Sequence, residues 1–329
     1  MSQRAWVALR WALGVGVVAL MVVGLDSAEV AARIGAANGP LVAVAVLGLT
    51  AVHALGAMTW AILCRQLSGF DMSWLTALRV YYAAQALGGI TPANLGGDAY
   101  RVVALRTASI GWGAAVAPVF VQRATSYLAL VGLALPAIGI LAFGSHLSSP
   151  ILPAALLMCA AAGGVGIAML AAPKRLNRLV ARRPRARPPA ATEAEPATAD
   201  WTRPALRGVA TGTGLGLAFH GVSVLLTALL LAAVDPIAVG LPVVAAIVVA
   251  RLSLAVPFLP SGLGANEAIL ALLFAGLGLS PQIALAGLLL GRVALLLTTL
   301  LGAGILILGR QQIPVAEVHE RRGAPVISR

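Results

Sequence analysis

Charged residues are scarce in this sequence: only 10% of its 329 residues are Asp, Glu, Lys or Arg, whereas 60% are hydrophobic. Soluble domains carry about 25% charged and about 45–50% apolar residues. A globule of this composition would have more apolar surface than it could bury, which excludes an ordinary soluble domain. Apolar runs of about 20 residues fit the hydrocarbon core of a bilayer. The sequence is therefore predicted to be an all-α polytopic membrane protein.

Cysteine is also nearly absent. Cys64 and Cys159 are the only two, each in or at the end of an apolar run. Neither shows CxxC or metal-ligand spacing, so we expect buried packing residues and no disulfide framework. We likewise expect no metal, no other cofactor and no enzymatic activity, since the sequence shows no nucleophile–base pair. The net charge of +12 lies mostly between apolar runs, which predicts contact with membrane lipid and not with nucleic acid.

Long apolar runs predict six transmembrane helices, at about 6–25, 40–63, 113–143, 150–172, 208–234 and 281–308. Two further apolar stretches, about 73–108 and 237–279, are interrupted by proline and glycine. Proline lacks an amide donor and glycine is a poor helix former, so each stretch is predicted to be a re-entrant helical hairpin. The broken backbone must then be buried in protein or line a wet cavity. The breaks are Pro92, Gly96 and Gly97 in the first hairpin, and Pro260 and Gly264 in the second.

The order of the predicted spans and hairpins divides the chain into two membrane halves, residues 1–172 and 208–309, with one hairpin each. Residues 173–207 between them are rich in arginine and proline and predict a cytoplasmic linker without fixed structure. Residues 310–329 predict a cytoplasmic tail. With both termini in the cytoplasm, the strongly basic loops fall inside, as the positive-inside rule requires, and all six tryptophans are expected at or near that interface.

The two hairpins repeat one another in sequence. The segment PANLGGD at 92–98 aligns with PSGLGANE at 260–267, and the acid that ends each is followed 25 positions later by an arginine, Arg123 or Arg292. Three predicted crossings lie between the copies, and an odd number inverts the second copy. We therefore expect an inverted-topology repeat whose broken tips meet near the bilayer midplane, as in many transporters.

Ionisable residues inside the hydrophobic units form the candidate site. A charge near the bilayer centre costs at least about 2.5–3.5 kcal/mol, so each needs a partner or a ligand. Arginines outnumber acids there, which predicts an anionic ligand such as a phosphate group, because the planar guanidinium donates two hydrogen bonds at once. The predicted ligand-binding residues are Arg123, Arg251 and Arg292, and the predicted counter-charge and hairpin residues are Asp98, Arg101, Asn266 and Glu267.

A structural role for the same groups remains open. The two acids also suit helix N-termini, where they would cap free amides. Arg123 and Arg292 would then be their buried salt-bridge partners. No acidic partner for Arg251 is evident in the sequence, which favours a ligand role for it. His53 and His220 are expected to form interhelical hydrogen bonds.

The runs 91–101 (TPANLGGDAYR) and 259–267 (LPSGLGANE), with the Gln122-Arg123 step between them, resemble the transmembrane region of lysylphosphatidylglycerol synthases and its stand-alone, flippase-like relatives. The resemblance extends from about residue 10 to residue 308. It implies a bacterial or archaeal cytoplasmic-membrane protein that handles lipid and, in the synthases, movement of aminoacylated phosphatidylglycerol between leaflets. The segment after residue 308 does not resemble the synthase domain, so that reaction is not expected. Many relatives carry an acid in place of Gln122, which makes the site here more positive.

We therefore expect a membrane lipid transporter that binds a phosphate-bearing head group, of a phospholipid or a polyprenyl phosphate, at the midplane. Two alternatives remain open: a transporter of a small soluble anion, and a non-transporting accessory subunit of a lipid glycosyl- or acyltransferase. A lipid-phosphate hydrolase acting through Asp98 is the weakest alternative. Gly212, Gly214 and Gly216 suit packing within the chain as well as between two chains.

Overall fold

A computed structural model of the chain describes residues 12, 15–21, 23–89, 91, 94–107, 111–144, 151–181, 202–236, 240–255 and 263–309. The side chains of 172–181, 202–205 and 254–255 are not among those described. Within these ranges the chain forms helices and no β-strand, which confirms the all-α fold class.

From residue 27 onward the described helices follow in this order along the chain. They are α2 (Ser27–Ala36), α3 (Gly39–Ala51), α4 (His53–Ser68), α5 (Trp74–Gly89), α6 (Leu95–Thr107), α7 (Trp112–Phe143), α8 (Ile151–Ala181), α9 (Thr202–Val234), α10 (Leu241–Arg251), the 3₁₀ helix η3 (Leu252–Ala255), α11 (Ala265–Gly276) and α12 (Pro281–Leu308).

Five helical segments of the described chain are long and apolar enough to cross a membrane. They are 39–68, formed by α3 and α4 together, and 112–143, 151–171, 206–234 and 281–308. These segments correspond to five of the six predicted spans. The sixth prediction, 6–25, is described in part: residues 12, 15–21, 23 and 24 are helical, whereas 6–11, 13, 14 and 22 lie outside the described ranges.

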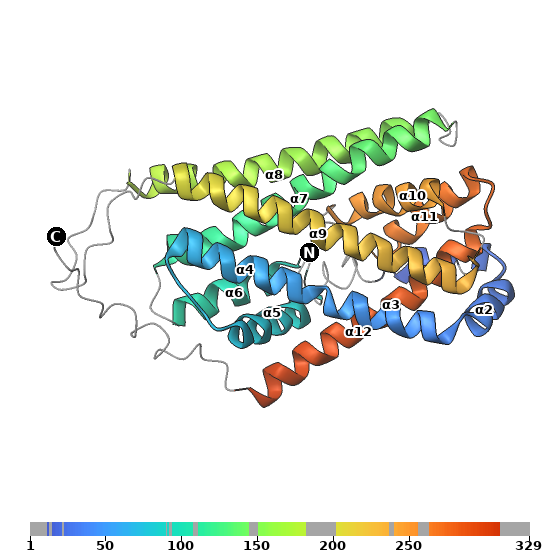
Figure 1. The fold of residues 1–329 in the computed structure, drawn as a ribbon, viewed down its shortest axis with the longest axis horizontal. Coiled ribbons are helices and arrows are strands. Elements are labelled where there is room, and N and C mark those ends of the chain that lie inside the picture. Colours follow the sequence, from blue (N-terminus) through green and yellow to red (C-terminus); the bar gives the residue numbers. More distant parts are fainter. Residues whose placement is uncertain are drawn as a thin grey trace.

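The long helices run roughly along the length of one elongated bundle (Figure 1). α7 packs along α8 and α9, and α12 packs against α3, α5 and α9. The short helices α5 and α6 pack together in one half of the bundle, and α10 and α11 pack together in the other half, the half that also holds α2 (Figure 1). Both predicted hairpins are therefore pairs of packed helices. Their breaks lie partly outside the described residues, and so do Pro92 and Pro260.

Glycine allows the first hairpin to close. A Cβ atom on Gly97 would collide with the Ala84 carbonyl oxygen of α5, and one on Gly96 would lie 2.9 Å from the Leu87 carbonyl oxygen. The Gly96 amide donates to the Thr91 hydroxyl at 2.8 Å, so the break retains a hydrogen bond where the helical ladder stops. In the second hairpin Gly264, directly before α11, has a φ of 85°, which only glycine adopts readily.

The helices around the predicted linker are longer than the apolar runs. α8 continues to Ala181 and α9 begins at Thr202, so both enter the predicted segment 173–207, whose central residues 182–201 lie outside the described ranges. Hydropathy marks where a chain leaves the hydrocarbon. A helix satisfies its own backbone hydrogen bonds and continues into water beyond that point.

The described tryptophans differ in burial. Trp60 is fully buried between α4 and its neighbours, whereas Trp74 and Trp112 are exposed. Trp60 belongs to a buried hydrophobic cluster, and its ring lies 5.9 Å from the guanidinium carbon of Arg101.

Small residues bring the long helices close together. Gly212 of α9 faces Thr125 of α7, and Gly216 faces Ala129, so these two glycines serve packing within the chain. The closest approach is at Gly302 of α12, which lies directly against the backbone carbonyl of Tyr82 in α5.

A methyl group at this contact should separate α12 from α5. Gly302→Ala is expected to lower the free energy of unfolding by about 1–3 kcal/mol, because the colliding atom is backbone and cannot turn aside. Gly304→Ala is the matched control, since no atom lies within 4 Å of its added Cβ. Thermal unfolding in detergent compares the two variants, and equal midpoints would contradict the close contact.

Candidate functional site

Asp98 is the centre of the first charged cluster. It lies in the first turn of α6, and its two carboxylate oxygens bind two different arginines. Oδ1 accepts from Nη2 of Arg101 at 2.7 Å, and Oδ2 pairs with Nη1 of Arg123, on α7, at 2.8 Å. One carboxylate thus faces two guanidinium groups, and the cluster carries a net charge of +1.

Arg101 is held from several helices at once. Its Nη1 donates to Oε1 of Gln122 on α7 at 2.5 Å, and Gln122 in turn donates to the Gly56 carbonyl of α4 at 2.8 Å. The Arg101 guanidinium carbon also lies 5.2 Å from the ring of Tyr81 in α5, in addition to its contact with Trp60. Aromatic rings at this distance attract a cation. These contacts fix the first hairpin to α4 and α7.

Glu267 is the centre of the second cluster. Its Oε2 accepts from the backbone amide of Gly264 at 2.9 Å, so Glu267, and not Asn266, caps the start of α11. Its Oε1 accepts from Nε of Arg292 on α12 at 2.7 Å and also from Nη2 of the same arginine. The Glu267 side chain is only 1% exposed. This cluster is neutral.

The two clusters are built in the same way. Each acid lies in the first turn of the second hairpin helix, and each partner arginine is the twelfth residue of the helix that follows, α7 or α12. At a rise of about 1.5 Å per residue, both arginines lie about 16 Å along their helices. The predicted pairs Asp98–Arg123 and Glu267–Arg292 are confirmed as contacts.

Arg251, the last residue of α10, makes its contacts to a different helix. Its Nη2 donates to the Ser223 carbonyl at 3.0 Å and to the Thr227 hydroxyl at 2.8 Å, both on α9. No carboxylate among the described residues pairs with it, and its Nε is buried without a hydrogen-bond partner. The sequence motifs gave no indication of Ser223 or Thr227, because both lie in an ordinary apolar span.

The two histidines differ. His220 shares a hydrogen bond with Ser126 across α9 and α7, at 2.9 Å between Nε2 and Oγ, as predicted. The prediction is wrong for His53, whose Nδ1 contacts the carbonyl oxygens of Leu49 and Thr50 one turn earlier in the same span. The α3–α4 junction lies at this turn. There, side chains contact the Thr50 carbonyl oxygen in place of the regular helical hydrogen bonds.

An all-helical chain with five apolar helices of membrane length is a multi-pass membrane protein. The family described as "Lysylphosphatidylglycerol synthase TM region" matches residues 7–302, so the chain belongs to that family. Among curated proteins, none matches the chain significantly. In the described part of the chain no group of histidine, cysteine and acidic residues is arranged to hold a metal ion.

The buried pair of the second cluster yields a prediction on stability. Glu267→Gln and Arg292→Gln should each lower the free energy of unfolding by about 3–5 kcal/mol, because each leaves one uncompensated buried charge. The double variant should lose clearly less than the sum. Chemical unfolding in micelles measures this cycle.

The control is Arg33→Gln, which breaks the more exposed contacts to Glu29 and Asp235. It should cost at most about 1 kcal/mol. Strictly additive effects of the Glu267 and Arg292 substitutions would show that the pair is not coupled.

Proposed function

We propose that this protein is a flippase-like lipid transporter that binds the phosphate-bearing head group of an anionic lipid near the bilayer midplane. The observation that carries the proposal is an excess of positive charge inside the fold. Four guanidinium groups face two carboxylates, which leaves a net charge of +2 on the six groups. They are Arg101, Arg123, Arg251, Arg292, Asp98 and Glu267. Such an excess is expensive at membrane depth, and an anionic ligand offsets it.

Two of the paired arginines, Arg123 and Arg292, are more accessible than their acids, whereas Arg101 is 7% exposed and less accessible than Asp98. The side chains of Arg123 and Arg292 are 18% and 21% exposed, whereas those of Asp98 and Glu267 are 14% and 1% exposed. A ligand that approaches the clusters therefore meets guanidinium groups first. Arginine binds phosphate oxygens through two parallel hydrogen bonds. In this proposal Asp98 and Glu267 orient the arginines and serve as counter-charges when no ligand is bound.

The packing of the helices supports an inverted-topology repeat. α5 of the first hairpin packs against α12 of the second half, and α10 of the second hairpin packs against α7 of the first half. In the same way, α4 packs on α7 and α9 packs on α12. The hairpins lie in opposite halves of the bundle (Figure 1). Six crossings with two oppositely entering re-entrant hairpins account for this reciprocal packing of each half against the other.

The proposed transport step follows from this arrangement. Arg123, Arg251 and Arg292 hold the head group while the two hairpins open in turn toward the cytoplasm and the outside, and the lipid tails remain in the membrane. The ligand is a phospholipid or a polyprenyl phosphate. The protein resides in the bacterial or archaeal cytoplasmic membrane with both termini inside. Family membership supports a role with lipid.

A non-transporting accessory subunit is the second candidate function. It is favoured by the two satisfied pairs Asp98–Arg123 and Glu267–Arg292, which would serve as locks between helices.

Leaflet exchange tests the proposal directly. Purified protein in liposomes should expose fluorescent phosphatidylglycerol from the inner leaflet to a membrane-impermeant quencher far faster than empty liposomes do. Arg123→Gln and Arg292→Gln should slow this by about tenfold or more, the effect of one lost charge-assisted hydrogen bond.

The matched control is Arg79→Gln, which removes the same charge from an exposed position in α5. Exchange no faster than in empty liposomes would refute lipid transport. Uptake of radiolabelled phosphate without lipid exchange would instead identify a transporter of soluble anions.

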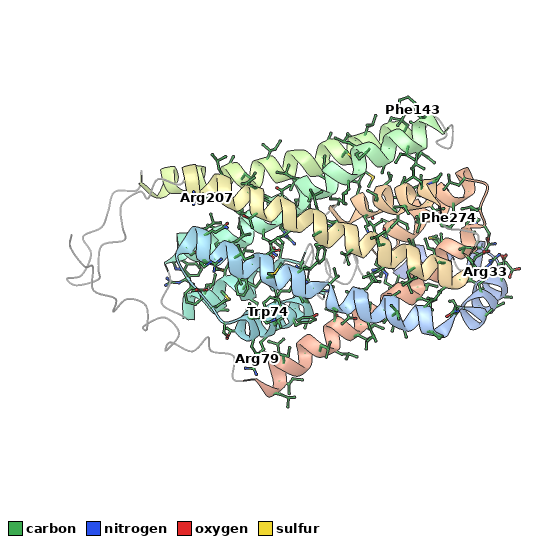
Figure 2. The ribbon with its side chains drawn as sticks, in the orientation of Figure 1. Arg33, Trp74, Arg79, Phe143, Arg207 and Phe274 are labelled. Carbon is green, nitrogen blue, oxygen red and sulfur yellow. The ribbon has the colours of Figure 1, made fainter. Side chains whose placement is uncertain are left out.

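The topology is tested with single cysteines in a background that replaces the buried Cys64 and Cys159 by alanine. Ser73→Cys, before α5, should react with an impermeant maleimide only after the cells are permeabilised. Ser280→Cys, before α12, should react in intact cells. Figure 2 shows Arg79 and Arg33 in opposite halves of the bundle, as this orientation requires. Labelling of both cysteines from the same side would exclude the inverted repeat.

A further inference from the structure

One face of α9 carries an unusual set of polar side chains. His220, Ser223 and Thr227 are spaced by three and four residues, so they lie on one side of the helix. All three are buried. This face meets Ser126 of α7 through His220, and it meets Arg251 of α10 through the other two. Polar groups of three helices thus meet along one face of α9.

His220 uses only one of its two ring nitrogens. Nε2 shares a hydrogen bond with the Ser126 hydroxyl, while Nδ1 is buried and has no partner in the described structure. A hydroxyl rotates freely and can donate to Nε2. In that arrangement the neutral ring carries its proton on Nδ1, which is then a buried donor without an acceptor.

Arg251 also has a buried donor without a hydrogen-bond partner. Its Nη2 is satisfied by α9, but its Nε–H is buried without an acceptor, and no carboxylate of the described chain neutralises its charge. The carboxyl end of α10, where Arg251 lies, supplies a dipole equivalent to about half a negative charge. Part of the positive charge therefore remains. His220 lies one helical turn before Ser223, whose carbonyl oxygen accepts from Arg251, so the two unsatisfied donors lie at neighbouring turns of one helix face.

We propose that this site binds a singly charged phosphate diester, with Arg251 as its charge partner and His220 as a neutral hydrogen-bond donor. A diester has one negative charge and two non-bridging oxygens, which matches one uncompensated guanidinium and two unused donors. The proposal rests on the proposed function and deepens it: it adds His220 to the ligand site and selects diesters over dianionic monoesters. The arginines of the two clusters differ from Arg251 because each pairs with a carboxylate.

Binding to the full-length protein in detergent tests the assignment. The probes are dioctanoyl phosphatidylglycerol as the diester, dioctanoyl phosphatidic acid as the monoester, and inorganic phosphate as the free anion. Isothermal titration should give the tightest binding for the diester. Arg251→Gln should weaken diester binding by about 10- to 100-fold, and Arg79→Gln should leave it unchanged.

Two substitutions of His220 separate its ring nitrogens. Asparagine places an amide donor near the Nδ1 position, whereas glutamine places one near Nε2, where it faces Ser126. His220→Gln should weaken diester binding by about tenfold, and His220→Asn should retain most of the affinity. The opposite order would overturn the role of Nδ1, because it would show that only the bond to Ser126 matters.

A second measurement tests whether Arg251 has a purely structural role. Bound diester should raise the unfolding temperature of the wild type and, by less, of Arg251→Lys, which keeps the charge but not the planar fork. Equal diester affinity in the wild type, Arg251→Gln and Arg251→Lys would refute this site.

The leaflet-exchange assay distinguishes the two proposals. Rapid exchange combined with unchanged affinity in Arg251→Gln refutes the site and leaves lipid transport intact. A wild type that neither exchanges nor binds lipid refutes both. Tighter binding of inorganic phosphate than of the diester would assign the site to a soluble anion and overturn the diester.

Discussion

Ionised groups inside an apolar bundle must be neutralised, and this requirement determines how the helices are joined. Asp98 binds Arg101 and Arg123, and so connects α6 to α7, while Glu267 connects α11 to α12. Each acid lies at the start of a helix, where its charge also complements the helix dipole. The same carboxylates therefore begin the second helix of each hairpin and attach it to the rest of the bundle.

The long helices and the two acid–arginine pairs were predictable because each depends on residues that are near one another in the sequence. Apolar runs indicated the long helices, and the spacing of 25 residues indicated the pairs Asp98–Arg123 and Glu267–Arg292. Both depend on one helix following another after a short turn. The structure leaves part of the sixth span, the linker centre and the two prolines of the breaks outside its described ranges.

Contacts between distant segments were not predictable in the same way. The partners of Arg251 are a backbone carbonyl and a hydroxyl on α9, and neither residue type signals a site in an apolar span. The contact of Trp60 with Arg101 joins residues some 40 positions apart in the chain. Such contacts depend on how helices cross one another, and a hydrophobic pattern does not specify the crossing.

The network around Arg101 restricts how the first half of the molecule can deform. Its guanidinium contacts residues of α4, α5 and α7 while its backbone belongs to α6. Moving the hairpin alone would break the Asp98–Arg123 ion pair together with the contacts of Arg101 to Gln122 and Trp60. In the proposed transport step the first hairpin would therefore open together with α4 and α7, as one block that slides past its neighbours along the apolar contacts of the bundle.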